Sequence, residues 1–258
     1  MKKYVFAALI AAFAAGANPA FAQSKDPIEV TADHALEWNR AETVFVARGN
    51  AVAVQGSMTF KSDVIIASYT DTDQGMVVNT IRGKGTSIVE TETATGYGDA
   101  ALYDLDAGYA ELTGVRPRIE TETDVITADN KIEYYIHDNK MVATGGVEVK
   151  SPDETLTADK VIAFFKKAAD GSNQLDTVHA EGNVVITTAT EILYGDKADY
   201  NVAGDKAVVT GNVRIEKDKN IITGQRAEFD MKTNISTMTS PGDNGRVKGI
   251  FYPEEKTE

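Results

Sequence analysis

The sequence predicts an all-β protein, one elongated antiparallel domain of stacked two-sheet repeats around an apolar interior groove. Three observations predict this fold. Hydrophobic residues alternate with a period of two, a unit of roughly 30 residues recurs, and no convincing helical stripe follows the N-terminal leader. The 258 residues are enough for one large all-β domain or two small ones.

Residues 1–22 predict a secretory signal peptide. Lys2 and Lys3 precede an apolar run that is too short to span a bilayer, and small residues at Ala20 and Ala22 mark a cleavage site. We expect a mature, exported chain that starts at Gln23. Because both lysines leave with the leader, the formal net charge changes from −13 to −15.

The composition limits the classes of partner and the organisation of the chain. A strongly acidic surface repels nucleic acid and anionic membrane surfaces, so neither is expected to bind. The chain has no cysteine, so its core and hydrogen bonds must hold it. Because no Pro-rich or low-complexity linker interrupts it, we expect one domain over residues 23–240, followed by a last edge strand and a charged tail over residues 241–258.

Alternation along the mature chain is typical of strands with one buried and one solvated face. In residues 131–136, Ile132, Tyr134 and Ile136 take alternate positions, and the same pattern recurs near Val147, Val213 and Phe229. Residues 159–170 come nearest to a helical stripe, but their β-branched and aromatic residues predict a strand.

The repeat has two constant marks. One is an Asp, replaced by Gln225 in the last copy, and the other is a Gly-led turn that begins at Gly49, Gly83, Gly114, Gly145, Gly182 and Gly211. The aspartates are Asp33, Asp63, Asp99, Asp129, Asp159 and Asp196. Gly-Asn tolerates positive φ and lets a strand bend or turn, and Asp can bond nearby backbone amides at a corner. Insertions between the two marks belong in hairpin tips, and a unit this short must stack on its neighbours to bury its apolar face.

Two details of the early repeats have specific expectations. Pro117 cannot donate to a sheet ladder, so its strand is expected to be bulged or at an edge. In the first copy the pattern leaves open whether Ala51 and Ala53 or Val52 and Val54 face inward.

The sequence offers no catalytic, metal or cofactor site. His34, His137 and His179 lie in different repeats without zinc-ligand spacing, and there is no P-loop or nucleophile elbow. The glycine-rich residues 93–100 lie in a repeat corner, and most carboxylates alternate with apolar residues as on a solvated face. We therefore expect a protein that is not an enzyme and carries no cofactor.

The arrangement of the predicted sheets is therefore expected to provide the function. Two sheets with apolar inner faces, held apart along one edge, form a groove for acyl chains, worth roughly 0.8 kcal/mol per buried CH₂. The end strands of a stack keep unpaired backbone groups that can pair with another molecule. The residues expected on these edge strands are Ile28 and Val30 at the start, and Val247, Ile250 and Tyr252 at the end.

The ordered series ITADNKIEYY, ATGGVEVKS, LTADKV, AEGNVVIT and VTGNVRIE, closing on RVKGIFYP, resembles the LptA/OstA-like family of lipopolysaccharide transport. The resemblance implies a periplasmic protein with an elongated antiparallel β-jelly roll, whose interior carries the acyl chains of lipopolysaccharide between the inner and outer membranes. It also implies edge-to-edge pairing with itself, head to tail, and with inner-membrane LptC-like and outer-membrane LptD-like proteins.

By this analogy and by strand parity, one set of residues is expected to line the lipid-binding inner face. The set is Ile126, Ala128, Ile132, Tyr134, Val147, Val149, Phe165, Val184, Ile186, Tyr200, Val213, Ile215 and Phe229. Two alternatives stay open at this point, a secreted polysaccharide-active β-solenoid or jelly-roll enzyme and a purely structural envelope protein. The enzyme needs a pair of catalytic acids and aromatic side chains that stack on sugars. The single tryptophan of the chain gives little support for such aromatic platforms.

Overall fold

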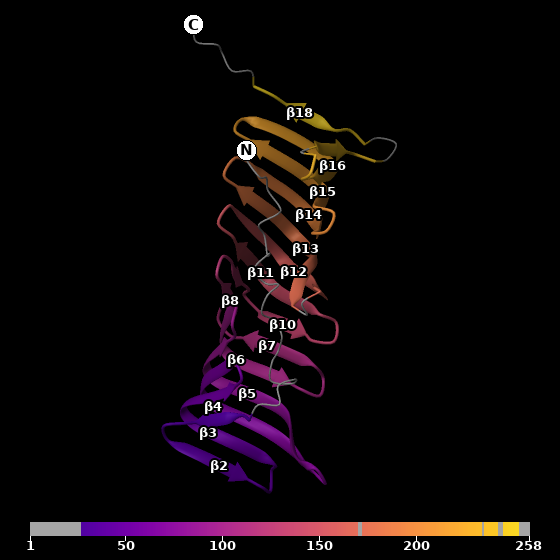
Figure 1. Cartoon of the computed structure of the whole chain (residues 1–258). Helices are drawn as coiled ribbons and strands as arrows, with labels where there is room; N and C mark the ends of the chain where they lie inside the picture. The colour runs from indigo at the N-terminus through magenta and orange to yellow at the C-terminus, as the bar shows by residue number, and fades with distance from the viewer. Residues whose placement is uncertain (1–26, 170–171, 234, 242–244, 253–258) are drawn as a thin grey trace.

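A computed structural model describes residues 27–169, 172–233, 235–241 and 245–252, and these residues form strands and turns without any helix (Figure 1). The predicted signal peptide and the last six residues of the predicted tail lie outside the described residues. The strands are β1 (Glu29–Thr31), β2 (Ala35–Asn39), β3 (Val44–Gln55), β4 (Met58–Thr72), β5 (Gly75–Glu90), β6 (Ala94–Asp104), β7 (Tyr109–Thr113), β8 (Arg118–Thr121), β9 (Val125–Thr127), β10 (Lys131–Tyr135), β11 (Lys140–Lys150), β12 (Glu154–Lys167), β13 (Asn173–Thr188), β14 (Ile192–Asn201), β15 (Lys206–Lys217), β16 (Asn220–Asp230), β17 (Ile235–Thr239) and β18 (Lys248–Ile250).

The strands form one continuous antiparallel meander that is folded into two layers. Each long strand runs through both layers: the first part of β3 pairs with β2, and its last part pairs with β1. We call the layer that contains β2, β7, β10 and β17 sheet 1, and the layer that contains β1, β8, β9 and β18 sheet 2. Figure 1 shows the resulting elongated stack, with β2 near one end and β18 at the other. The jelly-roll class predicted from the sequence is confirmed.

Inside the long strands the chain crosses between the sheets at β-bulges, whereas at Gly114, between β7 and β8, it crosses where the strand is interrupted. In β13 the register shifts between Glu181 and Val184, where Gly182 and Asn183 have φ values of 77° and 48°. A bulge adds a residue to one strand and bends it, and both residues here must tolerate the left-handed region. A Cβ on Gly182 would collide with the Asp159 carboxylate. Gly-Asn is therefore a corner inside a strand.

The recurring aspartates bind these corners across neighbouring strands. Asp159 accepts hydrogen bonds from Asn183 Nδ2 at 3.0 and 3.2 Å, and Asp33 and Asp196 accept equivalent bonds from the Asn of the next strand. At Asp63 and Asp99 the donor is a backbone amide, as the sequence predicted. The Asp and Gly-Asn marks repeat together because each aspartate positions the bulge of the next strand.

The structure also answers the questions about the early repeats. Ala51 and Ala53 face inward, with exposures of 0% and 2%, so the alanines and not the valines belong to the core. Pro117 lies at the corner between β7 and β8, where the strand is interrupted, and its carbonyl accepts a hydrogen bond from Ala128. Residues 159–167 are part of strand β12, as predicted.

The apolar interior divides into two clusters along the stack. We call residues 27–121, with strands β1–β8, the N-terminal half, and residues 125–252, with β9–β18, the C-terminal half. The smaller cluster includes Phe60, Ile81 and Leu112 of the N-terminal half, and the larger one fills the C-terminal half. Ile119 packs against both clusters. In the part of the chain that the structure describes, no helix is long and apolar enough to cross a membrane.

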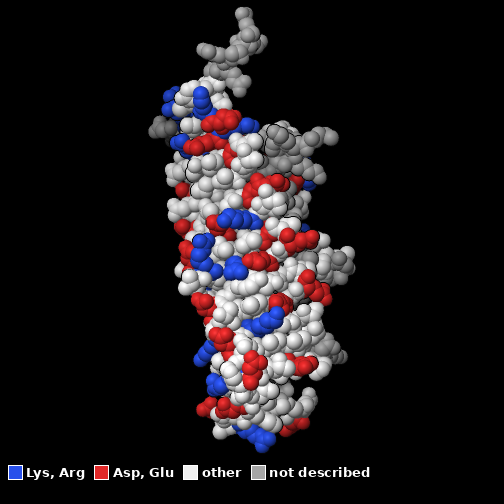
Figure 2. All heavy atoms as spheres, turned by 90° about the vertical axis from the view of Figure 1, so that its left-hand side faces the viewer, with Lys and Arg blue, Asp and Glu red and all other residues white. Residues whose placement is uncertain are grey.

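Figure 2 shows Asp and Glu side chains scattered along the length of one face, with Lys and Arg side chains between them. Exposed ion pairs such as Arg118–Glu120 at 2.6 Å and Lys61–Glu90 at 2.7 Å join neighbours on the outer faces of the sheets. Exposed pairs of this kind contribute little to stability, so the two interior clusters are the main support of the fold.

Candidate functional site

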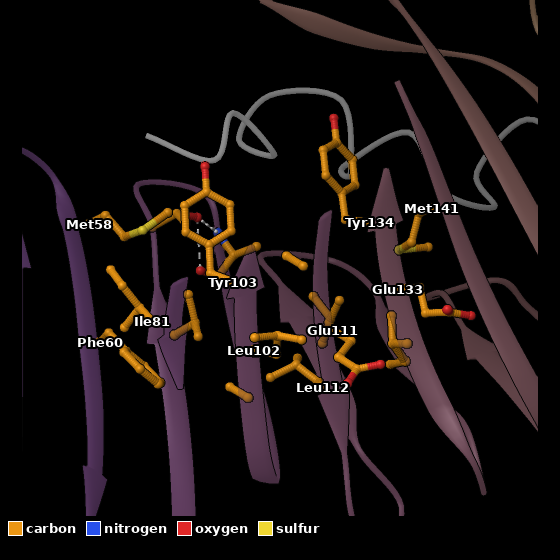
Figure 3. Close-up of a pocket in the computed structure, with 18 residues that line it drawn as sticks. Met58, Phe60, Ile81, Leu102, Tyr103, Glu111, Leu112, Glu133, Tyr134 and Met141 are labelled. Carbon is orange, nitrogen blue, oxygen red and sulfur yellow. Dashed lines mark hydrogen bonds between the residues drawn. The ribbon is translucent and has the colours of Figure 1, made fainter. Parts of the chain in front are cut away.

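An apolar cavity of about 160 Å³ lies between the two sheets, inside the N-terminal half and at its junction with the C-terminal half. Strands β4–β8, β10 and β11 form its walls (Figure 3). Its lining residues are Met58, Phe60, Ile81, Val89, Thr91, Ala94, Gly96, Ala101, Leu102, Tyr103, Ala110, Glu111, Leu112, Ile119, Ile132, Glu133, Tyr134 and Met141. The alternation of strand side chains directs most of the apolar members inward, whereas Leu102, Glu111 and Glu133 have the opposite parity.

The rim of the cavity carries aromatic and methionine side chains. Met58, Tyr103 and Tyr134 lie at strand ends beside connecting turns, and Figure 3 shows both tyrosine hydroxyls pointing to the same side of the cavity. Burial raises the pKa of Tyr134 to about 12, although a hydrogen bond from Asn173 lowers it. Tyr134 thus presents an apolar ring to the cavity and keeps a neutral hydroxyl. Methionine is flexible enough to adapt to an irregular apolar ligand.

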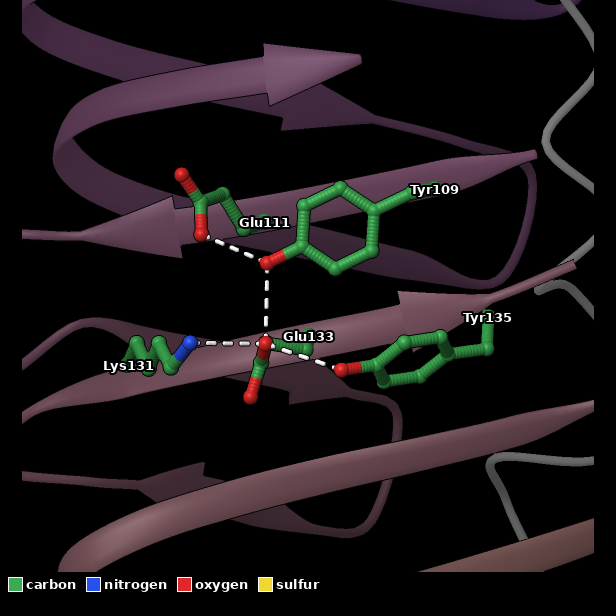
Figure 4. Close-up of polar contacts among 5 residues, drawn as sticks. All are labelled: Tyr109, Glu111, Lys131, Glu133 and Tyr135. Carbon is green, nitrogen blue, oxygen red and sulfur yellow. Dashed lines mark hydrogen bonds and ion pairs between the residues drawn. The ribbon is translucent and has the colours of Figure 1, made fainter. Parts of the chain in front are cut away.

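A polar cluster lies behind the cavity, on the outer face of sheet 1. Glu111 and Glu133 are cross-strand partners on β7 and β10, and their neighbours Leu112 and Ile132 line the cavity. The Tyr109 hydroxyl donates to Glu111 Oε2 at 2.6 Å and lies 2.9 Å from Glu133 Oε1 (Figure 4).

Hydrogen bonds offset the repulsion between these two carboxylates. Burial by itself raises the pKa of Glu133, but hydrogen bonds from Lys131, Tyr109 and Tyr135 outweigh it and hold that pKa below its ordinary value. Burial also raises the pKa of Tyr109, and its bonds to Glu111 and Glu133 raise it further. The cluster therefore joins β7 to β10 on the outer face of sheet 1.

The C-terminal half has a buried acid at its rim instead. Glu154 has an exposure of 5% and alternates with the buried Leu156 and Ala158, so it faces the interior. Burial and the negative charges of Asp153 and Asp124 raise its pKa to about 8. Its Oε1 receives no hydrogen bond from any described residue. Glu154 is therefore mostly neutral near pH 7, which reduces the cost of its burial.

All thirteen residues predicted for the inner face lie in or against the larger core cluster. Eleven are buried, and Tyr134 and Ile215 are partly buried. Ile132 and Tyr134 line the cavity, whereas the other eleven do not. Their part in lipid binding stays a prediction.

The sequence analysis did not identify the residues of the N-terminal half that line the cavity, above all Phe60, Val89 and Gly96. Phe60 and Val89 show the same alternation as the predicted set, so this signal was present. Gly96, which the sequence placed in a corner, lies inside strand β6. A glycine on an inner face gives no apolar signal.

The predicted edge strands are present but short, and each end has a second edge strand. β1 contains Val30, which packs on the smaller cluster, and Ile28 precedes it with an exposure of 36%. At the other end, Val247, Ile250 and Tyr252 are exposed on and beside β18. The sequence analysis did not predict β2 and β17, which are the edge strands of sheet 1.

These missed strands expose apolar side chains. Leu36 and Trp38 on β2 have exposures of 63% and 48%, and Ile235 on β17 has 61%. Trp38 stacks on Phe45 with 5.3 Å between ring centroids and donates to Tyr69 Oη at 2.8 Å, so it is held in place.

Metal chemistry finds no support in the described parts of the chain, where no three His, Asp or Glu side chains are grouped to hold an ion. His179 contacts Asp199, its cross-strand partner on the outer face of sheet 1. The walls of the cavity supply mainly apolar surface.

A family model and several known proteins match this chain. The model of the family described as LptA/(LptD N-terminal domain) LPS transport protein matches twice, over residues 29–140 and 125–235, and the matches share β9 and β10. The LPS-assembly protein LptD of Ralstonia nicotianae (strain ATCC BAA-1114 / GMI1000) is 32% identical over 93 residues, which is 36% of this chain but 11% of that protein. An uncharacterized protein of Rhizobium meliloti (strain 1021) is 22% identical over 158 residues, or 58% of this chain and 84% of that protein.

Among solved structures, LptH of Pseudomonas aeruginosa is described as the LptA-homologous periplasmic component of the lipopolysaccharide transport device. It is 13% identical, with a TM-score of 0.23, and the match covers 90% of this chain and 99% of that chain. The two family matches together span most of the described residues. The chain therefore belongs to the LptA/LptD N-terminal domain family of lipopolysaccharide transport proteins.

Proposed function

We propose that this protein is a non-enzymatic periplasmic carrier that holds the acyl chains of lipopolysaccharide between its two sheets. The observation that carries the proposal is the apolar cavity, formed by inward-facing side chains of seven strands in a chain of this transport family. The signal peptide expected at residues 1–22 supports export.

Acyl burial, not charge attraction, supplies the affinity in this proposal. A chain with a formal net charge of −13 repels phosphorylated headgroups, which therefore remain in solvent. Each methylene that enters the cavity contributes roughly 0.8 kcal/mol. An apolar cavity of about 150 Å³ stays dry and admits a benzene-sized group, so longer chains require the rim to open.

The two ends of the stack recruit partners by strand pairing. We propose LptC-like and LptD-like proteins as partners, and a second copy of this chain placed head to tail. The internal junction, where β7 and β8 pair with β10 and β9, supports this. The segment Thr-Ala-Asp that precedes β10 also precedes β2, so β2 corresponds to β10 and Leu36 corresponds to Ile132. Ile132 is 2% exposed within the junction, whereas Leu36 is 63% exposed at the open end.

The corresponding strands set the register of the proposed end-to-end contact. Residues 225–239 align without a gap on residues 99–113, so β17 corresponds to β7. Since Leu112 pairs with Ile132 in the junction, Met238 of one copy is expected opposite Leu36 of the next. This contact would remove both side chains from solvent and satisfy the unpaired edges.

Native mass spectrometry of the chain from Gln23 onward tests the proposal. Intact lipopolysaccharide is expected to give stoichiometric adducts, and fully deacylated lipopolysaccharide is expected to give none. Equal adducts with both ligands would contradict the acyl mechanism. Oligomers without lipid adducts would instead support the structural envelope protein.

A further inference from the structure

The two halves of the protein can be compared residue by residue on their inner faces. Residues 81–104 align without a gap on residues 178–201, with Gly85 on Gly182 and Tyr103 on Tyr200. Both segments form a long strand, a turn and a second strand, namely β5–β6 and β13–β14, and both strand pairs have a register shift at the corner. Each residue of the cavity wall in this segment therefore has a counterpart in the C-terminal half.

At the centre of this wall, two counterparts in the C-terminal half are larger. Gly96 corresponds to Leu193, and Val89, its cross-strand partner, corresponds to Ile186. The pair Ile186 and Leu193 is buried, with exposures of 1% and 3%, and packs inside the larger cluster. At the equivalent place in the N-terminal half the leucine side chain is missing, and the cavity is there.

Gly96 occupies the centre of this wall. It lies on β6 between Val89 of β5 and Ile119 of β8, and all three residues line the cavity. A Cβ added to Gly96 would come within 2.7 Å of Leu112 Cδ1 on the facing sheet. Any side chain at this position would therefore press on Leu112 and extend between the sheets.

The rims of the two halves also differ, because an apolar residue in the N-terminal half corresponds to an acid in the C-terminal half. The segment that begins β4 aligns with the segment that begins β12, with Asp63 on Asp159. In this alignment Met58 corresponds to Glu154. Met58 lines the cavity, whereas Glu154 puts a carboxyl group at the same place over the packed core. An apolar chain that entered the C-terminal half would displace packed side chains and press against the Glu154 carboxyl group, whose Oε1 receives no hydrogen bond from the described residues.

We propose that Gly96 confines acyl binding to the N-terminal half and the junction. Although the chain contains two family units, it then has one acyl-binding site and not two. Gly96 acts as the residue that determines which half is open, and Leu193 closes the other half. This inference rests on the proposed acyl-carrier function and names the segment in which it takes place.

A matched pair of substitutions tests the inference. Gly96→Leu is expected to weaken binding of purified lipopolysaccharide by about tenfold or more, since it fills the cavity, and Gly96→Ala is expected to give a smaller loss. Leu193→Met, a swap of similar volume at the equivalent position, is expected to leave binding unchanged. Unchanged binding by Gly96→Leu, or an equal loss in Leu193→Met, would overturn the inference.

A second measurement does not depend on filling the cavity. Thr91 lines the cavity and Thr188 is its counterpart in the C-terminal half. Since the chain has no cysteine, Thr91→Cys and Thr188→Cys each accept a single bimane label at one site. Lipopolysaccharide is expected to shift the emission of the label at position 91 and not at position 188.

The outcomes separate the inference from the function on which it rests. Equal responses of the two labels with bound lipid would overturn the confinement and leave the carrier function intact. Absence of lipid adducts in native mass spectrometry of the unsubstituted chain would overturn both.

Discussion

The N-terminal and C-terminal halves follow the same chain path but differ in how side chains fill the space between the sheets. Both halves use bulges as corners and aspartates that bind the next corner. The N-terminal half contains Gly96 and Met58 at positions where the C-terminal half has Leu193 and Glu154. The repeated backbone pattern thus specifies the fold, and the size and polarity of a few inward side chains specify which part of the interior stays open.

The largest expected effect comes from opening the closed half. Leu193→Ala is expected to lower the free energy of unfolding by about 2–5 kcal/mol, because it removes buried surface and leaves a cavity. Leu112→Ala is expected at the lower end of this range, since Leu112 already borders a cavity and loses fewer contacts. Urea unfolding followed by circular dichroism measures both losses. A loss for Leu112→Ala equal to or above that for Leu193→Ala would contradict the described difference in packing.

The buried acid predicts a pH dependence that is specific to the C-terminal half. Because folding raises the pKa of Glu154 to about 8, its contribution to stability is complete below the ordinary carboxyl value of 4.5 and is lost as the pH rises through 8. Between these values the unfolding free energy of the unsubstituted chain is expected to fall relative to Glu154→Gln by up to about 1.4 kcal/mol per pH unit.

Urea unfolding at a series of pH values measures this difference. Met58→Gln, at the equivalent rim position, serves as the control, because it adds the same amide without removing a titrating group. Its difference from the unsubstituted chain is expected to stay constant with pH. A constant difference for Glu154→Gln as well would show that this carboxyl ionises alike in the folded and unfolded chains.

The open ends can be compared with the internal junction. If Leu36 is buried between copies as Ile132 is buried in the junction, Leu36→Ser is expected to weaken self-association by about tenfold. Analytical ultracentrifugation measures this. The register is tested by oxidising Leu36→Cys together with Met238→Cys, two positions expected to lie directly opposite. Preferential cross-linking of Leu36→Cys with Ser236→Cys, two residues out of register, would contradict the proposed pairing.

The fold was predictable because strand alternation fixes which side chains share a face. Ile126, Val147, Val184 and Val213 are buried as parity required, although they lie on four different strands. The corners were interpreted as turns because positive φ at Gly-Asn occurs in turns and bulges alike. Only the register of the neighbouring strands separates these two structures, and register depends on contacts far apart in the sequence.

The open part of the interior was less predictable than the fold. A packed core and a groove have the same apolar inner face, so alternation selected residues in the C-terminal half without showing that their side chains fill the space. The cavity is lined by Gly96, a residue without a side chain, where the C-terminal half has Leu193. A comparison of the two halves at equivalent inner positions shows this difference even in the sequence alone.

The smallest expected effect concerns the corners that both halves share. Asn183 donates its side-chain amide to Asp159, whereas at the equivalent corner Asp63 accepts from the backbone amide of Thr86. Asn183→Ala is therefore expected to cost about 1 kcal/mol of stability, from the lost hydrogen bond and from an alanine at a φ of 48°. Thr86→Ala keeps its backbone donor and is expected to cost less.

Urea unfolding of the two variants side by side measures this difference. Equal losses would mean that the aspartates stabilise the corners mainly through the backbone, in which case Asn follows Gly in the repeat because it tolerates positive φ. A larger loss at Asn183 would assign the repeated Asp and Asn to one contact between neighbouring strands. The distance of about 30 residues between successive copies would then be the chain length needed to return to the same corner.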